Sequence, residues 1–154
     1  MLQRIQSIYL LGALLLIVAL FFVPFAEIVG SDGSIYVFDK AGIYLQGAKD
    51  PEILYGGLAI QVFLGIIVLV NLVTIFSFKK RIRQIRLSVF NILLMIGLSG
   101  VIYYFASHSA KLLGGKFSFE PSLVMPLIAV VLTYLAIRSI GRDEALVRSI
   151  DRIR

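Results

Sequence analysis

Residues 53–78 read ILYGGLAIQVFLGIIVLVNLVTIFSF, and none of these 26 positions carries a charged side chain. The basic run KKRIRQIR follows at once, at 79–86. A bilayer-crossing helix needs about 20 consecutive apolar residues, and positive charges commonly flank such a helix on one side. The stretch therefore predicts a membrane-spanning helix that ends at a basic loop.

Three further stretches have the same character. Residues 5–26, 87–107 and 121–137 are also free of charged side chains, and Arg138 can extend the last one to about residue 140. Backbone amides in hydrocarbon must be hydrogen-bonded within the segment, which favours helices. We expect an all-α membrane protein: one integral domain, residues 1–154, that forms a four-transmembrane-helix bundle with helices at about 5–26, 53–78, 87–107 and 121–140.

Composition excludes several classes of protein. The 154 residues have a mean hydropathy of +0.95, with 59% hydrophobic and 16% charged residues, which a soluble domain of this size could not bury. The chain has no cysteine and one histidine, His108, so thiol chemistry and haem held between paired histidines are excluded. No spacing indicates a metal site, and we expect no cofactor.

The basic residues are distributed unequally. The N-terminal flank, the 79–86 loop and the region after residue 137 carry 11 of the 15, whereas the other two loops carry 4. Positive residues resist translocation. Both termini are therefore expected on the cytoplasmic side of a bacterial inner membrane, and the net charge of +6 is explained without nucleic acid.

The outer loops differ from each other. Residues 34–38 and 43–45 are rich in strand-forming residues and flank a glycine-containing turn at 39–42, which predicts a small extracytoplasmic β-hairpin. Residues 108–120 contain Gly114 and Gly115 and are expected to form a flexible loop.

The tail at 141–154 predicts a separate amphipathic helix on the cytoplasmic face. Gly141 can end the preceding helix, Asp143 can cap the new one, and Leu146 and Ile150 recur on one face. The tail and the basic loop supply the candidate contacts to lipid or to a partner. These candidates are Arg81, Arg83, Arg86, Asp143, Glu144, Arg148, Asp151 and Arg152.

Small and amide side chains within the spans are interpreted as contacts between helices. Asn71 and Asn91 lie on the two sides of one helical hairpin and could meet. The full set is Gly57, Gln61, Gly65, Asn71, Asn91, Gly97 and Gly100. No carboxylate lies within a span, which argues against a proton-coupled transporter.

Three segments resemble a known family. They are residues 1–10 (MLQRIQSIYL), 79–87 (KKRIRQIRL) and 143–154 (DEALVRSIDRIR). Together they resemble the four-span family of Bacteroidota known as domain of unknown function 4293. The resemblance implies an inner-membrane protein with four helices, and it implies no activity. All three segments fall on the cytoplasmic side of the expected topology, where they could form one platform.

No nucleophile–base arrangement is present, so no catalytic residue is assigned and an enzyme acting on lipid is disfavoured. The favoured hypothesis is a non-enzymatic accessory or scaffold subunit that docks a partner membrane complex. The expected partners are membrane lipids and another membrane protein or a second copy of the chain. The alternative is a small oligomeric transporter or channel that is not driven by an intramembrane carboxylate.

Overall fold

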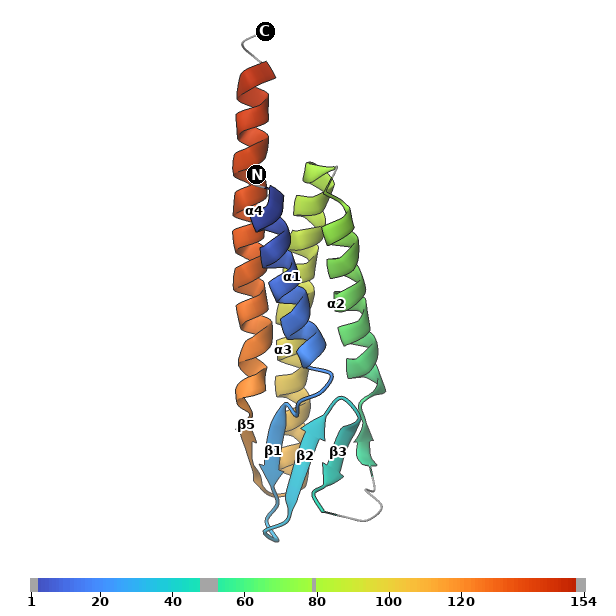
Figure 1. The fold of residues 1–154 in the computed structure, drawn as a ribbon. Coiled ribbons are helices and arrows are strands. Elements are labelled where there is room, and N and C mark those ends of the chain that lie inside the picture. Colours follow the sequence, from blue (N-terminus) through green and yellow to red (C-terminus); the bar gives the residue numbers. More distant parts are fainter. Residues whose placement is uncertain (1–2, 48–52, 79, 152–154) are drawn as a thin grey trace.

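The computed structural model describes residues 3–47, 53–78 and 80–151, which form four helices side by side and a small sheet at one end (Figure 1). The helices are α1 (Gln3–Ala19), α2 (Leu58–Phe76), α3 (Arg81–Leu112) and α4 (Val124–Asp151), with a short 3-10 helix η1 (Pro121–Leu123) before α4. The strands are β1 (Ala26–Val29), β2 (Ile35–Asp39), β3 (Gly42–Leu45), β4 (Ile53–Gly56) and β5 (Lys116–Phe119).

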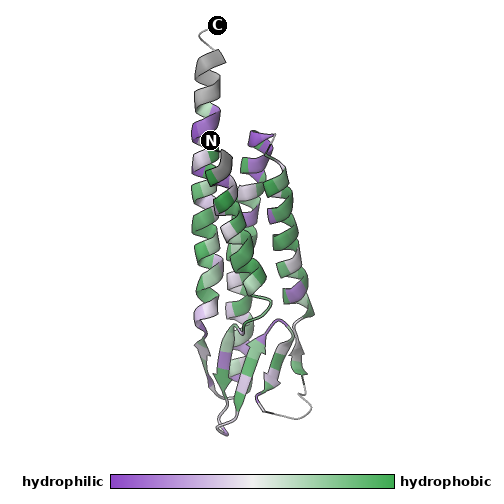
Figure 2. Ribbon diagram, viewed as in Figure 1, coloured by the Kyte–Doolittle hydropathy of each residue, from purple (hydrophilic) through white to green (hydrophobic). Residues whose placement is uncertain are grey.

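Among the described residues, three helical stretches are long and apolar enough to cross a membrane: α2, α3 and residues Pro121–Ala145. The mostly helical, membrane-type architecture expected from the sequence is confirmed to this extent. Apolar residues dominate the middle of all four helices, and polar residues gather at the end away from the sheet (Figure 2). We call this the polar end: the place where α1 begins, α4 rises past the others and α2 turns into α3.

The helix bounds differ from those expected. Helix α1 ends at Ala19 rather than at residue 26, and it is shorter than the usual span. Pro24 has no backbone N–H and restricts the residue before it, so the chain makes a tight turn and enters β1. Helix α2 begins at Leu58 rather than at residue 53, because residues 53–56 pair with β3.

The expected separate C-terminal helix is wrong within the described residues. Helix α4 runs through Gly141 without a break to Asp151, and Asp143 is buried in mid-helix rather than acting as a cap. A glycine inside a helix costs roughly 1 kcal/mol. Buried contacts of Ile140 and Asp143 on either side of Gly141 offset this cost.

The sheet has the strand order β4-β3-β2-β1-β5, and every neighbouring pair is antiparallel. The expected hairpin is confirmed as β2–β3, where Asp39 pairs with Gly42 and accepts a hydrogen bond from the Ala41 amide at 2.7 Å. The hairpin is thus the centre of a larger sheet that the sequence did not predict.

The flexible loop expected at 108–120 is also wrong. Helix α3 continues to Leu112, and β5 then pairs with β1, with Ile28 opposite Phe117. Gly114 has a φ of +60°, and Gly115 lies directly against the Val29 carbonyl. These two glycines allow the turn that brings the second loop onto the first.

An apolar layer joins the sheet to the helices. Phe25, Ile28, Phe38 and Ile43 are fully or almost fully buried, and the rings of Phe25 and Phe38 meet edge to face at 5.5 Å. They belong to the same core cluster as Ile102 and other inward residues of α3. The sheet therefore forms a packed base at one end of the helices.

Candidate functional site

The buried side chains between α2 and α3 change from apolar near the sheet to polar near the polar end. Buried positions of α2 are apolar near the sheet and polar toward the polar end, in the order Ile60, Leu64, Ile67, Asn71, Thr74 and Ser77. The inward face of α3 repeats the pattern in reverse, in the order Gln84, Ser88, Asn91, Met95, Leu98 and Ile102. Because the two helices are antiparallel neighbours, their polar halves lie together.

Several of these polar atoms have no hydrogen-bond partner among the described residues. They are both side-chain amide atoms of Asn71, the Ser88 hydroxyl and the Asn91 carbonyl oxygen. Asn71 and Asn91 are each 1% exposed and lie within about three turns of the α2–α3 connection. A buried polar group without a partner costs about 1–3 kcal/mol, so this region is polar at an energetic cost. Thr74 and Thr133 avoid the cost by bonding carbonyls of their own helices.

A second cluster closes the polar end. The Gln6 side-chain amide of α1 donates a hydrogen bond to the Asp143 carboxylate of α4, which is 9% exposed. From α3, Arg81 donates to the Asp143 main-chain carbonyl at 3.3 Å and lies 3.7 Å from the Glu144 carboxylate. Three helices are therefore tied together by Gln6, Arg81, Asp143 and Glu144, which we call the three-helix clasp.

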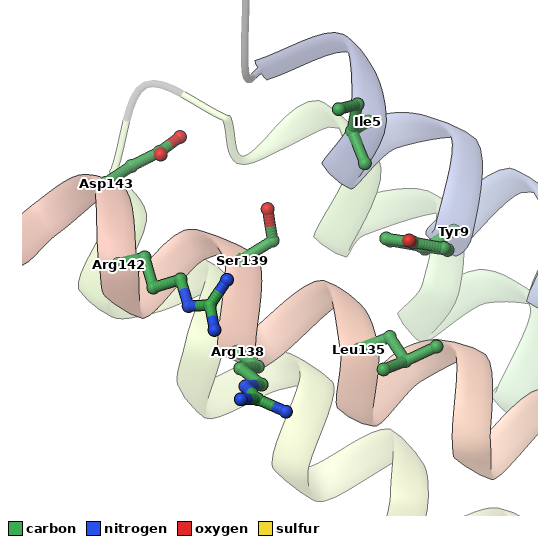
Figure 3. Close-up of a pocket in the computed structure, with 7 residues that line it drawn as sticks. All are labelled: Ile5, Tyr9, Leu135, Arg138, Ser139, Arg142 and Asp143. Carbon is green, nitrogen blue, oxygen red and sulfur yellow. The ribbon is translucent and has the colours of Figure 1, made fainter.

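A groove of about 440 Å³ lies beside the clasp, between α1 and α4. Figure 3 shows Ile5 and Tyr9 of α1 across from the α4 residues that line it. The α4 lining consists of Leu135, Arg138, Ser139, Arg142 and Asp143. The groove thus combines two guanidinium groups and two hydroxyls with an apolar wall.

The three segments that suggested a family together supply all four residues of the clasp. Gln6 comes from the first segment, and Arg81 comes from the basic segment 79–87, in which residues 81–87 form the start of α3 rather than a loop. Asp143 and Glu144 come from the start of the C-terminal segment. The sequence matches the family described as a domain of unknown function (DUF4293) over residues 2–153. The chain belongs to the DUF4293 family. No curated protein matches it.

In this DUF4293 protein the described candidate partner contacts separate into three groups. Arg81, Asp143 and Glu144 come together in the clasp, whereas Arg83 and Arg86 lie exposed on the first turns of α3. Arg148 and Asp151 continue α4 beyond the clasp. Arg152 lies outside the described residues.

The small residues singled out for helix packing are placed differently from one another. A Cβ on Gly57 would lie 2.0 Å from the Lys40 carbonyl oxygen, so Gly57 packs on the β2–β3 turn rather than on a helix. The Gln61 side-chain amide donates to the same oxygen at 3.1 Å. Gly97 faces the ring of Phe63 on α2, with 3.5 Å between the Cβ position and the ring. Gly65 and Gly100 have no neighbour within 4 Å of a Cβ position.

In the part of the chain that the structure describes, no group of three or more histidine, aspartate or glutamate side chains is placed to hold a metal ion. The ring of His108 stacks on Tyr104. Outside the helices, hydrogen bonds from Ser34 hold the pKa of Asp32 below its ordinary value. Burial, together with the neighbouring Asp39 carboxylate, raises the pKa of Tyr44.

Sequence reasoning missed the groove and the role of Gln6. A signal was present for Gln6, because it is a lone amide four residues before Leu10 on the face that continues with Ala13 and Ile17. Arg138 and Arg142 carried no comparable signal, since their neighbours on α1 are set by tertiary packing.

Proposed function

We propose that this protein is a non-enzymatic accessory or scaffold subunit of the bacterial inner membrane that docks a partner membrane complex at its polar end. One observation carries the proposal. Helix α4 continues without a break past the point where its neighbours end, so its last turns rise alone (Figure 1).

The three-helix clasp supports this role by fixing the direction of α4. Gln6 of α1 and Arg81 of α3 both hydrogen-bond to Asp143, which lies eight residues before the end of α4 at Asp151. The last turns of α4 carry apolar residues Leu146 and Ile150 together with charges of both signs, such as Arg148 and Asp151. A helix that is already ordered loses less entropy on binding than a free tail does. The partner that fits is a helical surface with its own apolar stripe and complementary charges.

The proposal includes four membrane crossings with both termini in the cytoplasm. Helix α1 is about 25 Å long at its 17 residues, slightly less than the hydrocarbon thickness. Its outer face nevertheless presents large apolar side chains, with Leu15 61% exposed, as expected for contact with lipid. The excess of basic residues at the polar end supports the cytoplasmic assignment.

The test is crosslinking in native membranes followed by mass spectrometry, with the full chain and with a chain that ends at Ala145. The shortened chain keeps Asp143 and Glu144 and therefore keeps the clasp. We expect it to insert normally and to lose a stoichiometric partner that the full chain captures. A matched control, Lys111→Gln with Lys116→Gln, alters charge at the sheet end and should keep the partner.

Two results contradict the proposal. One is a full-length chain that captures no stoichiometric partner. The other is a shortened chain that captures the same partner equally well.

A second candidate, a small oligomeric transporter or channel, is favoured by the polar interior. Among the described residues, buried polar atoms of Asn71, Ser88 and Asn91 have no hydrogen-bond partner, and they lie in the polar halves of α2 and α3, where they could bind water or a polar solute. Solute flux through liposomes that contain the purified protein alone tests this candidate. Asn71→Leu with Asn91→Leu should reduce such flux, whereas Met95→Leu on the same face of α3 should not. Absence of flux in the parent protein excludes the candidate.

A further inference from the structure

We propose that the groove between α1 and α4 binds the phosphate of an anionic phospholipid from the inner leaflet. This inference rests on the membrane placement given above and does not require a partner complex. The shared chemistry of possible ligands is a phosphate group, and we assign it to a lipid such as phosphatidylglycerol.

The charges of the groove suit a phosphate. Arg138 and Arg142 are four residues apart on α4, so they lie on the same face of the helix, and both are exposed. Arginine presents several N–H donors in a planar arrangement that matches phosphate oxygens. The hydroxyls of Ser139 and Tyr9 add donors from the two sides of the groove.

One carboxylate, that of Asp143, is among the seven lining residues. It accepts the hydrogen bond from Gln6 and is largely buried. The two guanidinium groups exceed it in charge, so the groove keeps a net positive charge.

The position of the groove relative to the membrane favours a lipid over a soluble anion. Arg138 is the first charged residue after the uncharged stretch 121–137, and it therefore falls where headgroups meet hydrocarbon. Leu135 and Ile5 supply the apolar wall, and Ile5 is 45% exposed. A lipid can place its phosphate on the arginines while its acyl chains remain beside the apolar wall. The volume of about 440 Å³ is within the range of small-molecule sites.

The experiment measures lipid retention by native mass spectrometry on the full chain, purified alone in detergent. Phosphatidylglycerol and phosphatidylcholine are the probes, and inorganic phosphate is added in a separate arm as a competitor. We expect Arg138→Gln with Arg142→Gln to weaken phosphatidylglycerol binding by about tenfold or more, because two charge-assisted contacts are lost. Circular dichroism checks that the variant keeps its helices.

The matched control is Arg83→Gln with Arg86→Gln, which removes the same charge from exposed positions of α3 at the same end. It should leave phosphatidylglycerol binding within about twofold of the parent, because neither residue lines the groove. Equal loss in both double variants would mean diffuse attraction to anionic lipid and would overturn the site. Unchanged binding in the groove variant would also overturn it.

Two further outcomes would overturn the assignment to an anionic lipid. Retention of phosphatidylcholine equal to that of phosphatidylglycerol would show that the net charge of the headgroup does not select the lipid. Displacement of the lipid by inorganic phosphate at similar concentration would assign the groove to a soluble anion instead. The assay contains no partner, so its failure is distinguishable from failure of the scaffold proposal.

Discussion

The side-chain amide of Gln6 donates a hydrogen bond to the carboxylate of Asp143, which is 137 positions further along the chain. The bond joins the first turns of α1 to the C-terminal half of α4. Arg81 of α3 completes the contact through the Asp143 carbonyl. Residues from three distant segments therefore set the position of one helix end.

Replacing Gln6 with leucine should destabilise the protein. The variant leaves a largely buried carboxylate without its donor, which costs about 1–3 kcal/mol. Thermal unfolding of the purified protein in micelles, followed by circular dichroism, measures the loss. Asp143→Asn, which keeps a polar partner without a buried charge, should lose less. Equal stability of Gln6→Leu and the parent would contradict the role assigned to the pair.

Alanine at Gly57 or Gly115 should destabilise the join between sheet and helices. The added Cβ would lie 2.0 Å from the Lys40 carbonyl oxygen or 1.9 Å from that of Val29, and backbone must shift in either case. We expect a loss of about 1–3 kcal/mol for each, measured by the same unfolding assay. Gly65→Ala and Gly100→Ala are the controls, because nothing lies within 4 Å of either site.

Those controls also test the packing role that the sequence suggested for Gly65 and Gly100. Both glycines are inside helices, so alanine at either position should stabilise the protein by up to about 1 kcal/mol rather than destabilise it. If either control instead alters the oligomeric state on a sizing column, that glycine contacts a second molecule.

Cysteines at Glu27 and Ser118 should form a disulfide under mild oxidation. The two residues are register partners in β1 and β5, and antiparallel partners place their Cα atoms within disulfide range. The natural chain has no cysteine, so no other disulfide can form within the chain. Glu27→Cys with Lys116→Cys is displaced by two residues and should crosslink poorly. Equal yields would mean that residues 116–119 are not held against β1.

Cysteines introduced singly at Ser34 and Ser149 should react with a membrane-impermeant maleimide from opposite sides of the membrane. Ser34 lies just before β2 in the sheet, and Ser149 lies on the last turns of α4. The expected reaction is at Ser34 in intact spheroplasts and at Ser149 in inverted vesicles. Reaction of both from one side would overturn the four-crossing topology.

Alkaline pH should weaken the β2–β3 hairpin through Tyr44. Its hydroxyl donates to Asp39 at 3.2 Å, and its pKa is raised in the folded protein. A raised pKa means that the stabilisation is complete below pH 10 and is lost as pH rises through the folded value. Unfolding measured between pH 9 and pH 12 should therefore show a steeper decline for the parent than for Tyr44→Phe. Parallel declines would contradict the contribution of this pair.

The sequence predicted the helical stretches well where apolar length decides the outcome. The uncharged run at 53–78 and the basic run after it locate α2 and the turn to α3 within a few residues. The β2–β3 hairpin was also predictable, because its strands are neighbours in the chain and the turn between them is short. Each of these features depends on residues that are close in sequence.

The features that were predicted wrongly depend on contacts between residues that are distant in the sequence. The short strand β5 (Lys116–Phe119) forms because it pairs with β1, which lies about ninety residues earlier in the chain. Gly141 looks like a helix end by itself, yet α4 continues because Asp143 is held by Gln6 and Arg81. Residues 53–56 look like part of a membrane span in the sequence, yet they form the edge strand β4 and pair with β3.

The sequence by itself determined that this protein is built from apolar helices with a basic excess at one end, because the cost of placing charge and backbone in hydrocarbon acts on each segment separately. Tertiary structure alone decided which polar residues meet. Gln6 with Asp143, the groove at Arg138 and Arg142, and the polar halves of α2 and α3 all arise from how the helices pack. Packing chooses partners by shape and distance in space, and no local pattern in the chain records that choice.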